Sequence, residues 1–281
     1  MRHLLFSSFF LVLLTACKNE NPRDSNPVQS VDSNNNQTLP ESVVNTKPEV
    51  LPTGLCLKDF KFSEESCDLT IPEGVDVMED WCNKREVNGL RVSLKNNKIA
   101  SKINAQICKA ITGKGGDQQT IKKFVQSIKT QNYEEGDIEF FQDEYNCKLM
   151  DSSLNYLSIQ LSTYSYSMGA AHGISGVQML NFDLHTGEKI KLSDVFVDNY
   201  RKDLIGFAKK RFMEQNGSQG WWFESGEQAF DLPSEFIITR KGIDFCYQAY
   251  EIGPYAAGLP RLKMKKEELA KWLKKNPYIK P

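Results

Sequence analysis

Residues 157–161 read Leu157-Ser158-Ile159-Gln160-Leu161, with apolar and polar side chains in strict alternation. This period of two is typical of a β-strand that buries one of its faces. The alternation continues through Tyr164, Tyr166 and Met168, where the large side chains occupy even positions instead of odd ones. We therefore expect a long, bent strand with a bulge near Ser162-Thr163.

Further strands are expected on the C-terminal side of this segment. The run Val177–Leu184 is followed by His185-Thr186-Gly187-Glu188 and then by Lys189–Leu192. This order is typical of a hairpin in which glycine supplies a positive φ. Two short apolar runs, Phe236–Thr239 and Ile243–Tyr247, predict two more strands.

Four segments are expected to be helical. In the first, isoleucine recurs every fourth position, at Ile99, Ile103, Ile107 and Ile111, before Gly113 ends the helix. The second helix contains Ile121, Phe124, Val125 and Ile128. The third extends from Asp198 or Asn199 to Asn216, and the fourth covers Lys265–Lys275. A loop-rich entry up to about Asn88 and a short strand at Leu90–Leu94 precede them. These elements predict an α+β fold, with a mostly antiparallel sheet and packed helices.

The N-terminus has the pattern of a bacterial lipoprotein signal. Arg2 precedes an apolar run from Leu4 to Leu14, which is too short to span a bilayer permanently. The run ends in Leu14-Thr15-Ala16-Cys17, where small residues stand directly before a cysteine. We expect cleavage before Cys17 and lipidation of its thiol, which would anchor the mature chain to a membrane of the bacterial cell envelope, outside the cytoplasm.

The residues behind this cysteine lack the composition of a folded segment. They are rich in Asn, Pro, Ser, Gln, Val and Thr and contain no aromatic residue, so they bury too little apolar surface to fold. We expect a signal peptide over residues 1–16 and a lipidated, disordered tether over 17–54. Behind them, we expect a small α+β domain over 55–150 and a second α+β domain over 151–281.

Six cysteines remain once Cys17 is assigned to the lipid. An even number in an exported chain favours three disulfides among Cys56, Cys67, Cys82, Cys108, Cys147 and Cys246. Proximity in sequence favours Cys56 with Cys67, whereas Cys147 and Cys246 both lie in strand-like segments and could form a bridge between strands. No two cysteines have the spacing of a zinc knuckle, so we expect neither a metal nor another cofactor.

The charges are balanced overall but unevenly distributed. The formal net charge of −1 gives no support to nucleic-acid binding. Acidic residues gather in one short segment, at Glu134, Glu135, Asp137, Glu139, Asp143 and Glu144, whereas lysines crowd the C-terminus. Each run is a solvated face, or else a surface for a partner of opposite charge.

Several ordered blocks of the C-terminal half resemble a known family. These blocks are Gly169-Ala170-Ala171-His172-Gly173, Asn181–Glu188, Leu192–Phe196, Gly242–Phe245 and Tyr250–Gly258. They are similar to the RsiV-like extracellular domain family. Upstream, the strand at Leu90 and the helix with Ile103-Asn104 and Ile107 resemble the small domain at the N-terminus of PdaC-like peptidoglycan deacetylases.

The resemblance implies an envelope domain that meets peptidoglycan or proteins that act on it. A member of the RsiV-like family binds lysozyme and thereby exposes an anti-sigma factor to proteolysis. Here only the removable signal precedes the lipid cysteine, so we expect no membrane-spanning anti-sigma factor. We also find no segment that resembles the separate catalytic domain of the deacetylases.

No catalytic motif accompanies these blocks. His172 lies among small residues, but no spacing supports a nucleophile and base, and Gly-x-Ser-x-Gly is absent. We therefore expect a non-catalytic binding module for peptidoglycan or a lysozyme-like cationic protein. A hydrolase or transferase that acts on wall glycans and a purely structural lipoprotein are the alternatives.

Aromatic and acidic side chains are the candidate ligand-binding residues. Adjacent aromatics in the glycine-bounded segment 221–223 cannot all face inward, and exposed rings stack on sugars or anchor partners. The candidates are Trp221, Trp222, Phe223, His172, Tyr164, Tyr166, Glu134, Glu135, Asp137 and Glu139.

Overall fold

The computed structural model describes residues 54–67, 82–130, 140–167, 169–218, 220–226 and 228–280. Cys17, the signal peptide and all but the last residue of the predicted tether lie outside these ranges. Within them, no helix combines the length and the apolar character needed to cross a membrane.

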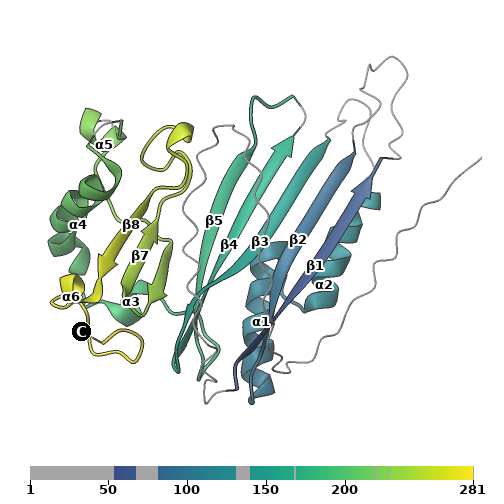
Figure 1. The fold of residues 1–281 in the computed structure, drawn as a ribbon, viewed down its shortest axis with the longest axis horizontal. Coiled ribbons are helices and arrows are strands. Elements are labelled where there is room, and N and C mark those ends of the chain that lie inside the picture. The colour runs from purple at the N-terminus through teal and green to yellow at the C-terminus, as the bar shows by residue number, and fades with distance from the viewer. Residues whose placement is uncertain are drawn as a thin grey trace, which may run out of the picture. The chain divides into compact units, whose positions relative to one another are not determined.

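A five-stranded sheet forms the larger layer of the fold (Figure 1). Its strands lie in the order of the chain: β1 (Cys56–Ser66), β2 (Asn83–Ser93), β3 (Phe141–Ser152), β4 (Tyr156–Ser167) and β5 (Ile174–Asp183). Strands β2 and β3 are parallel, and the other neighbours are antiparallel. The expected α+β fold with a mostly antiparallel sheet is confirmed.

Two helices cover one face of this sheet, α1 (Asn97–Thr112) and α2 (Gln118–Gln126), and a 3-10 turn, η1 (Ser127–Thr130), follows. The isoleucine face of α1 is buried, together with Leu157, Ile159 and Leu161 of β4. Gly113 ends α1 with a φ of 74°, as its position after the last isoleucine predicts. The odd positions of β4 therefore face the helices, and the even positions face away.

A three-stranded antiparallel sheet lies on the C-terminal side of the chain (Figure 1). It contains β6 (Phe236–Thr239), β7 (Gly242–Cys246) and β8 (Arg261–Lys265). Helix α4 (Tyr200–Asn216) packs on it through Leu204, Ala208 and Phe212. The short elements are α3 (Leu192–Val195), α5 (Trp222–Ser225), α6 (Lys266–Leu269) and η2 (Tyr255–Ala257).

Buried Asn181 joins the two sheets. Its Oδ1 accepts hydrogen bonds from Ser158 Oγ at 2.8 Å and from Ile238 N at 2.9 Å. Its Nδ2 donates to Phe236 O at 2.7 Å. All three hydrogen bonds are buried. Asn181 therefore pairs with polar atoms that water cannot reach, at the junction between the two sheets.

Some predicted elements are corrected by the structure. Strand β4 pairs with both neighbours without a break at Ser162-Thr163, and the irregularity lies in β3 between Leu149 and Asp151. No bulge is needed because odd and even positions of a regular strand already point to opposite faces. The expected entry loop contains β1 and the start of β2, and the helix predicted over Lys265–Lys275 is only α6, preceded by β8.

Two further features concern the expected hairpin and the expected domain boundary. The turn at residues 185–188 forms, with Gly187 at a φ of 71°, but the expected strand after it is a single bridge between Phe182 and Lys189. The domain boundary expected after residue 150 falls inside β3, and β4 and β5 continue the same sheet.

The three-disulfide framework is wrong. Cys67 pairs with Cys82, and Cys108, Cys147 and Cys246 are free thiols. Pairing of Cys56 with Cys67 fails because the extended β1 separates them: Cys56 begins the strand and Cys67 follows its last residue, about 36 Å away at 3.3 Å per residue. The disulfide instead flanks the pair Ser66 and Asn83, where it closes the β1–β2 ladder.

The proposed bridge between Cys147 and Cys246 is also excluded. Cys147 lies on β3 against the core beneath α1 and α2, whereas Cys246 lies on β7 in a separate cluster with Val177, Met179 and Ile237. Burial raises the pKa of both thiols to about 11. Both are therefore protonated and poorly reactive at neutral pH.

Candidate functional site

The turn between β4 and β5 is built around Gly173. A Cβ atom added to this residue would lie 2.3 Å from the Tyr164 ring, so only glycine fits beneath that ring. The Gly173 carbonyl also accepts a hydrogen bond from the Tyr255 hydroxyl at 2.6 Å. Gly173 therefore fixes two aromatic side chains that are far apart in sequence.

His172 joins the same group of rings. Its imidazole stacks on Tyr255, with ring centroids 4.1 Å apart and an interplanar angle of 18°. Nδ1 lies 2.9 Å from Gly173 O, and Nε2 lies 3.1 Å from the Tyr250 hydroxyl. With the proton on Nδ1, the imidazole donates to the carbonyl and accepts from Tyr250. Both ring nitrogens thus have partners within the protein.

Two hydrogen bonds hold the segment 248–258 beside β5. Gln248 Oε1 accepts from Val177 N at 3.0 Å, and Gln248 Nε2 donates to Val177 O at 2.6 Å. This amide thus continues the hydrogen bonding of the strand edge. Figure 1 shows the loop between β7 and β8 at the same end of the molecule as the β4–β5 turn.

The resulting surface exposes aromatic side chains. Two of the seven exposed large hydrophobic side chains among the described residues lie here: Tyr250 is 47% exposed and Tyr164 36%. We call Tyr164, His172, Tyr250 and Tyr255 the His172 patch. Clustered apolar exposure of this kind marks interaction surfaces, whereas single exposed residues are ordinary.

Tyr250 carries a strained backbone within this patch. Its φ is 64°, in the left-handed region that side chains other than Asn and Asp seldom adopt. The strained conformation places the hydroxyl beside His172 Nε2 while half of the side chain stays in solvent. Strain of this type persists where the surroundings enforce it, and functional sites are common locations for it.

An exposed carboxylate borders the patch. Glu144 of β3 pairs directly with Tyr164 of β4, so their side chains lie on the same face of the sheet. Tyr166, half-buried, stands two positions further on opposite Gln142. Glu144 thus adds negative charge next to the aromatic rings.

The other predicted aromatic site is not exposed. Trp221 and Phe223 are 8% and 6% exposed and pack edge to face against Phe212 of α4. Trp222 is half-buried. The candidate binding loop is thus mainly core, because the helical turn of α5 directs two of its three rings inward.

Trp221 nevertheless affects the His172 patch indirectly. A Cβ atom at Gly253 would lie 3.0 Å from its ring, and Trp222 N donates to Ile252 O at 3.0 Å. The Trp221 ring therefore supports the segment that carries Tyr250 and Tyr255. Its predicted role as a sugar-stacking surface is replaced by a positioning role.

The predicted acidic residues Glu134, Glu135, Asp137 and Glu139 lie outside the described residues. Asp143 is described and is half-buried, on the helix side of β3. It accepts from Arg85 Nε and Nη2 at 3.1 and 2.8 Å, while the guanidinium lies 4.2 Å from the centroid of the Phe124 ring. Asp143 is thus used internally.

Two places among the described residues were candidates for metal binding or acid-base chemistry. One group there, Glu65, Cys67 and Cys82, brings three metal-binding side chains together, and the disulfide removes both thiolates. At the His172 patch, the imidazole contacts a carbonyl and a phenol rather than a carboxylate or serine hydroxyl. A nucleophilic triad requires the latter partners.

Two members of the patch were not predicted from the sequence. Tyr250 and Tyr255 lie within a block of the family resemblance, Tyr250–Gly258, which was the available signal. Periodicity could not find them because Tyr250 and Tyr255 belong to an irregular loop, and their proximity to His172 is a tertiary contact.

Comparison with known protein families agrees with the two-part resemblance. Residues 82–175 match the family described as deacetylase PdaC, and residues 193–267 match the family described as a protein of unknown function, DUF3298. The chain is thus similar to a PdaC-type region followed by a DUF3298 region. The expected recognition is thereby confirmed, with DUF3298 as the RsiV-like part.

Solved structures show the same fold. A DUF3298 family member from Bacteroides fragilis aligns over 80% of this chain and 96% of its own, with 19% identity and a TM-score of 0.65. A DUF3298 family protein from Pseudomonas aeruginosa aligns over 78% and 94%, with 17% identity and a TM-score of 0.59. A comparison with curated proteins gave no match.

The disulfide and the PdaC match together indicate an extracytoplasmic protein of the cell envelope. Cytosolic reductants keep most thiols reduced, so a structural disulfide is typical of oxidising compartments. Cys67 and Cys82 enclose a 15-residue separation, for which loop closure contributes about 3 kcal/mol to stability.

Proposed function

We propose that the protein is a non-catalytic, lipid-anchored binding module of the bacterial envelope that captures a lysozyme-like cationic protein through the His172 patch. The observation that carries this proposal is the cluster of exposed Tyr164 and Tyr250 around the stacked pair of His172 and Tyr255. Anchoring occurs through Cys17, which precedes the described residues.

The patch has the chemistry of a protein interface centre. Tyrosine is enriched among residues that dominate binding energy, because it buries a large area and loses few rotamers. Here the rings are already held by hydrogen bonds to Gly173 O and His172. Preorganisation of this kind lowers the entropic cost of association.

The charge next to the patch favours a cationic partner. Glu144 lies beside Tyr164, and the acidic sequence run that starts at Glu134 leads directly into β3. Such carboxylates accelerate encounter with a basic protein and make the association rate sensitive to salt.

The absence of turnover is part of the proposal. Both nitrogens of His172 are engaged, and the ring is covered on one side by Tyr255. An imidazole in this arrangement contributes a polar contact and a fixed ring plane rather than a general base with a bound nucleophile.

Calorimetry with the mature chain and a purified lysozyme tests the proposal. The double variant Tyr250→Ala, Tyr255→Ala should weaken binding by about 30-fold, which corresponds to about 2 kcal/mol for an interface hot spot. Leu154→Ala is the matched control, since Leu154 is 47% exposed and lies in the turn at the other end of β4.

The same titration separates the alternatives. Equal affinities for the double variant and the wild type would exclude the patch as the binding surface. Binding of muropeptides at the patch in place of lysozyme, or release of cleaved glycan, would favour a glycan-binding module or an enzyme respectively.

A further inference from the structure

Strand β1 lies at one edge of the five-stranded sheet (Figure 1). Its residues pair with β2 along the whole strand, and no register shift interrupts the ladder. On its outer side, β1 has no neighbouring strand among the described residues. An edge of this kind presents backbone N–H and C=O groups that can pair with another strand.

The other edge of the sheet, formed by β5, is closed within the fold. Val177 N and Val177 O are both bonded to the Gln248 amide. Further along β5, Asn181 O accepts a hydrogen bond from Ile190 N at 2.8 Å. The groups that cover β5 come from segments that follow it in the chain, whereas the described residues contain no such cover for residues 58–62 of β1.

The usual features that protect an exposed edge are mostly absent from β1. The strand is 11 residues long, contains no proline and keeps a regular register. Very short strands, prolines and bulges are common means by which natural sheets prevent edge pairing. Charged side chains are another, and in β1 they have both signs. Whether these charges repel or attract a second strand therefore depends on the register.

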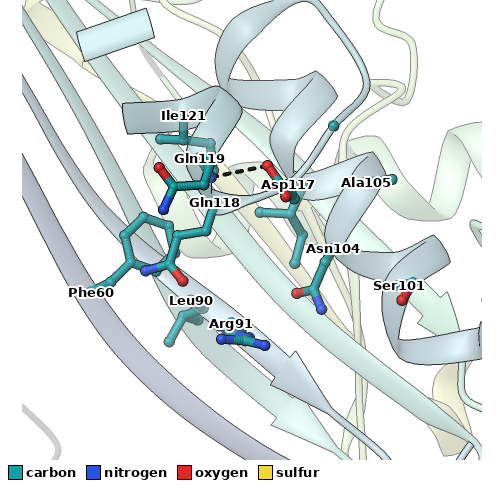
Figure 2. A pocket seen from close by; sticks show the side chains of 12 residues that line it. Phe60, Leu90, Arg91, Ser101, Asn104, Ala105, Asp117, Gln118, Gln119 and Ile121 are labelled. Atoms are coloured by element: carbon teal, nitrogen blue, oxygen red, sulfur yellow. Dashed lines mark hydrogen bonds between the residues drawn. The ribbon is translucent and has the colours of Figure 1, made fainter. Parts of the chain in front are cut away.

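The aromatic side chains at the middle of β1 leave the outer edge open. A Cβ atom added to Gly89 of β2 would lie 2.1 Å from the Phe60 ring, so this ring leans inward over β2. Figure 2 shows Phe60 near Gln118 and Gln119, with which it lines a cleft at the start of α2. Phe60 and Phe62 both pack against the core beneath the helices. A second backbone can therefore approach β1 from outside.

Asp59 and Lys61 are the exposed charged residues at the middle of β1. Asp59 has no hydrogen-bond or ion-pair partner among the described residues. Lys61 Nζ lies 2.8 Å from Glu86 Oε1, yet the lysine side chain is 60% exposed. Because an ammonium group has three N–H donors, Lys61 can bind a second carboxylate as well. The edge thus offers an unused anion next to an accessible cation.

A two-fold axis at this edge would pair residues that are equally far from one central residue. Three registers keep most of β1 paired, those centred on Phe60, Lys61 or Phe62. A centre at Lys61 places two ammonium groups opposite each other, and a centre at Phe62 places Asp59 opposite Glu65. Like charges directly opposite each other are destabilising. With Phe60 at the centre, Asp59 of each copy instead lies opposite Lys61 of the other.

We propose that two copies of this chain pair antiparallel through β1, with Phe60 at the two-fold axis, and form one continuous sheet. This register satisfies outer backbone groups of both edges and forms the pair of Asp59 and Lys61 twice. Because β1 and β5 are opposite edges of the sheet, the dimer leaves the His172 patch of each copy accessible. The inference does not depend on the function proposed for that patch.

Sedimentation equilibrium of the mature chain tests this inference. The wild type should show twice the monomer mass at high protein concentration and the monomer mass on dilution. Asp59→Lys should weaken dimerisation about 30-fold, because both pairs across the axis change from attraction to repulsion. Asp203→Lys makes the same change in net charge at an exposed position of α4, so this matched control should dimerise like the wild type.

A mixture of two variants gives the sharper test. Lys61→Asp should also weaken dimerisation, because two carboxylates then lie opposite each other twice. An equimolar mixture of Asp59→Lys and Lys61→Asp should restore dimers, since every pair across the axis again joins a lysine to an aspartate. The double variant Asp59→Lys, Lys61→Asp should dimerise with itself for the same reason. Circular dichroism checks that each variant is folded.

Hydrogen exchange locates the dimer surface. The outward amides of residues 58–62 should exchange more slowly at dimeric concentrations than in the dilute monomer. Protection of these amides in the dilute monomer would assign the edge to another segment of the chain and would contradict the inference.

Three further results would overturn it. They are a monomer mass at the highest soluble concentration, dimerisation of both single variants as strong as that of the wild type, and failure of the mixture to restore dimers. Asp59→Lys should bind lysozyme as tightly as the wild type, so failure of the dimer is distinguishable from failure of the His172 patch.

Discussion

The two ends of one sheet face differ sharply in what covers them. At one end, Asn181 of β5 is 2% exposed and bonded to β6, and Met179 N donates to Glu235. At the other end, Tyr164 and Glu144 on the same face are exposed to solvent. The same strands therefore serve as an internal junction at one end and as a surface at the other.

This difference separates stability from recognition. Asn181, Ser158 and Met179 N at the junction have hydrogen-bond partners inside the protein, so a change there affects folding. The apolar groups at the open end have few neighbours, so a change there affects folding little and binding strongly. The predictions below use this contrast, in order of decreasing effect.

Asn181→Leu should lower the free energy of unfolding by about 3 kcal/mol. The substitution leaves Ser158 Oγ, Phe236 O and Ile238 N without their partner, and each buried unsatisfied group costs about 1–3 kcal/mol. Chemical denaturation measures the change. Asn146→Leu, at the open half of the face and bonded only to Asn88, should cost less than about 1 kcal/mol.

Gly173→Ala should cost about 2 kcal/mol, because the new methyl group must displace the Tyr164 ring. The same displacement should weaken lysozyme binding. Gly206→Ala on α4 is the control, since open space surrounds that position and alanine favours helices by about 1 kcal/mol. Thermal unfolding that ranks the two variants in the reverse order would contradict the close contact at Gly173.

Tyr250→Gly should stabilise the fold and weaken binding at once. Glycine relieves the positive φ, which costs on the order of 1 kcal/mol for tyrosine, while the substitution removes the exposed ring. Tyr250→Phe, which retains the ring, should bind nearly as well as the wild type. A loss of stability in Tyr250→Gly would show that the ring contributes to the core rather than to recognition.

Glu235→Gln should change the pH dependence of stability. Burial raises the pKa of Glu235 in the folded protein, so the folded state binds this proton more tightly than the unfolded state. The stability that it contributes is present below the unfolded pKa, about 4.3, and is lost as the pH rises through the raised pKa. The variant should therefore gain stability relative to the wild type as the pH rises above the unfolded pKa.

The smallest expected effect concerns the rate at which the cysteine thiols react with an alkylating reagent. Cys147 and Cys246, each with a pKa raised to about 11 by burial, should react slowly with iodoacetamide at pH 8 in the native protein. After unfolding without a reductant, mass spectrometry should find label on Cys108, Cys147 and Cys246 and none on Cys67 or Cys82. Label on Cys67 would contradict the disulfide.

The sequence predicted the helices and strands better than the contacts between them. Isoleucine spacing located α1, and glycine located its end, because both signals are local. Strand β1 was missed because its core-side residues Phe60 and Phe62 alternate with charged and polar residues on a half-buried edge strand. Edge strands bury little surface, so their apolar signal is weak.

The candidate site was predicted only in part. His172 and Tyr164 were identified, but Tyr255 joins them through the Gly173 carbonyl, a contact across 82 positions. The disulfide pairing could not be predicted from the sequence either, because it depends on which strand ends lie next to each other. Trp221 and Phe223 were expected in a glycine-bounded loop whose adjacent aromatics cannot all face inward, whereas the helical turn of α5 buries both rings.

Hydrogen–deuterium exchange of the mature chain with and without lysozyme tests the central claim most directly. The account predicts slower exchange in residues 169–177 and 248–258, which contain the His172 patch, and unchanged exchange in 118–126 and at the junction around Asn181. Protection confined to α4 and the C-terminal lysines, with none at the β4–β5 turn, would contradict it.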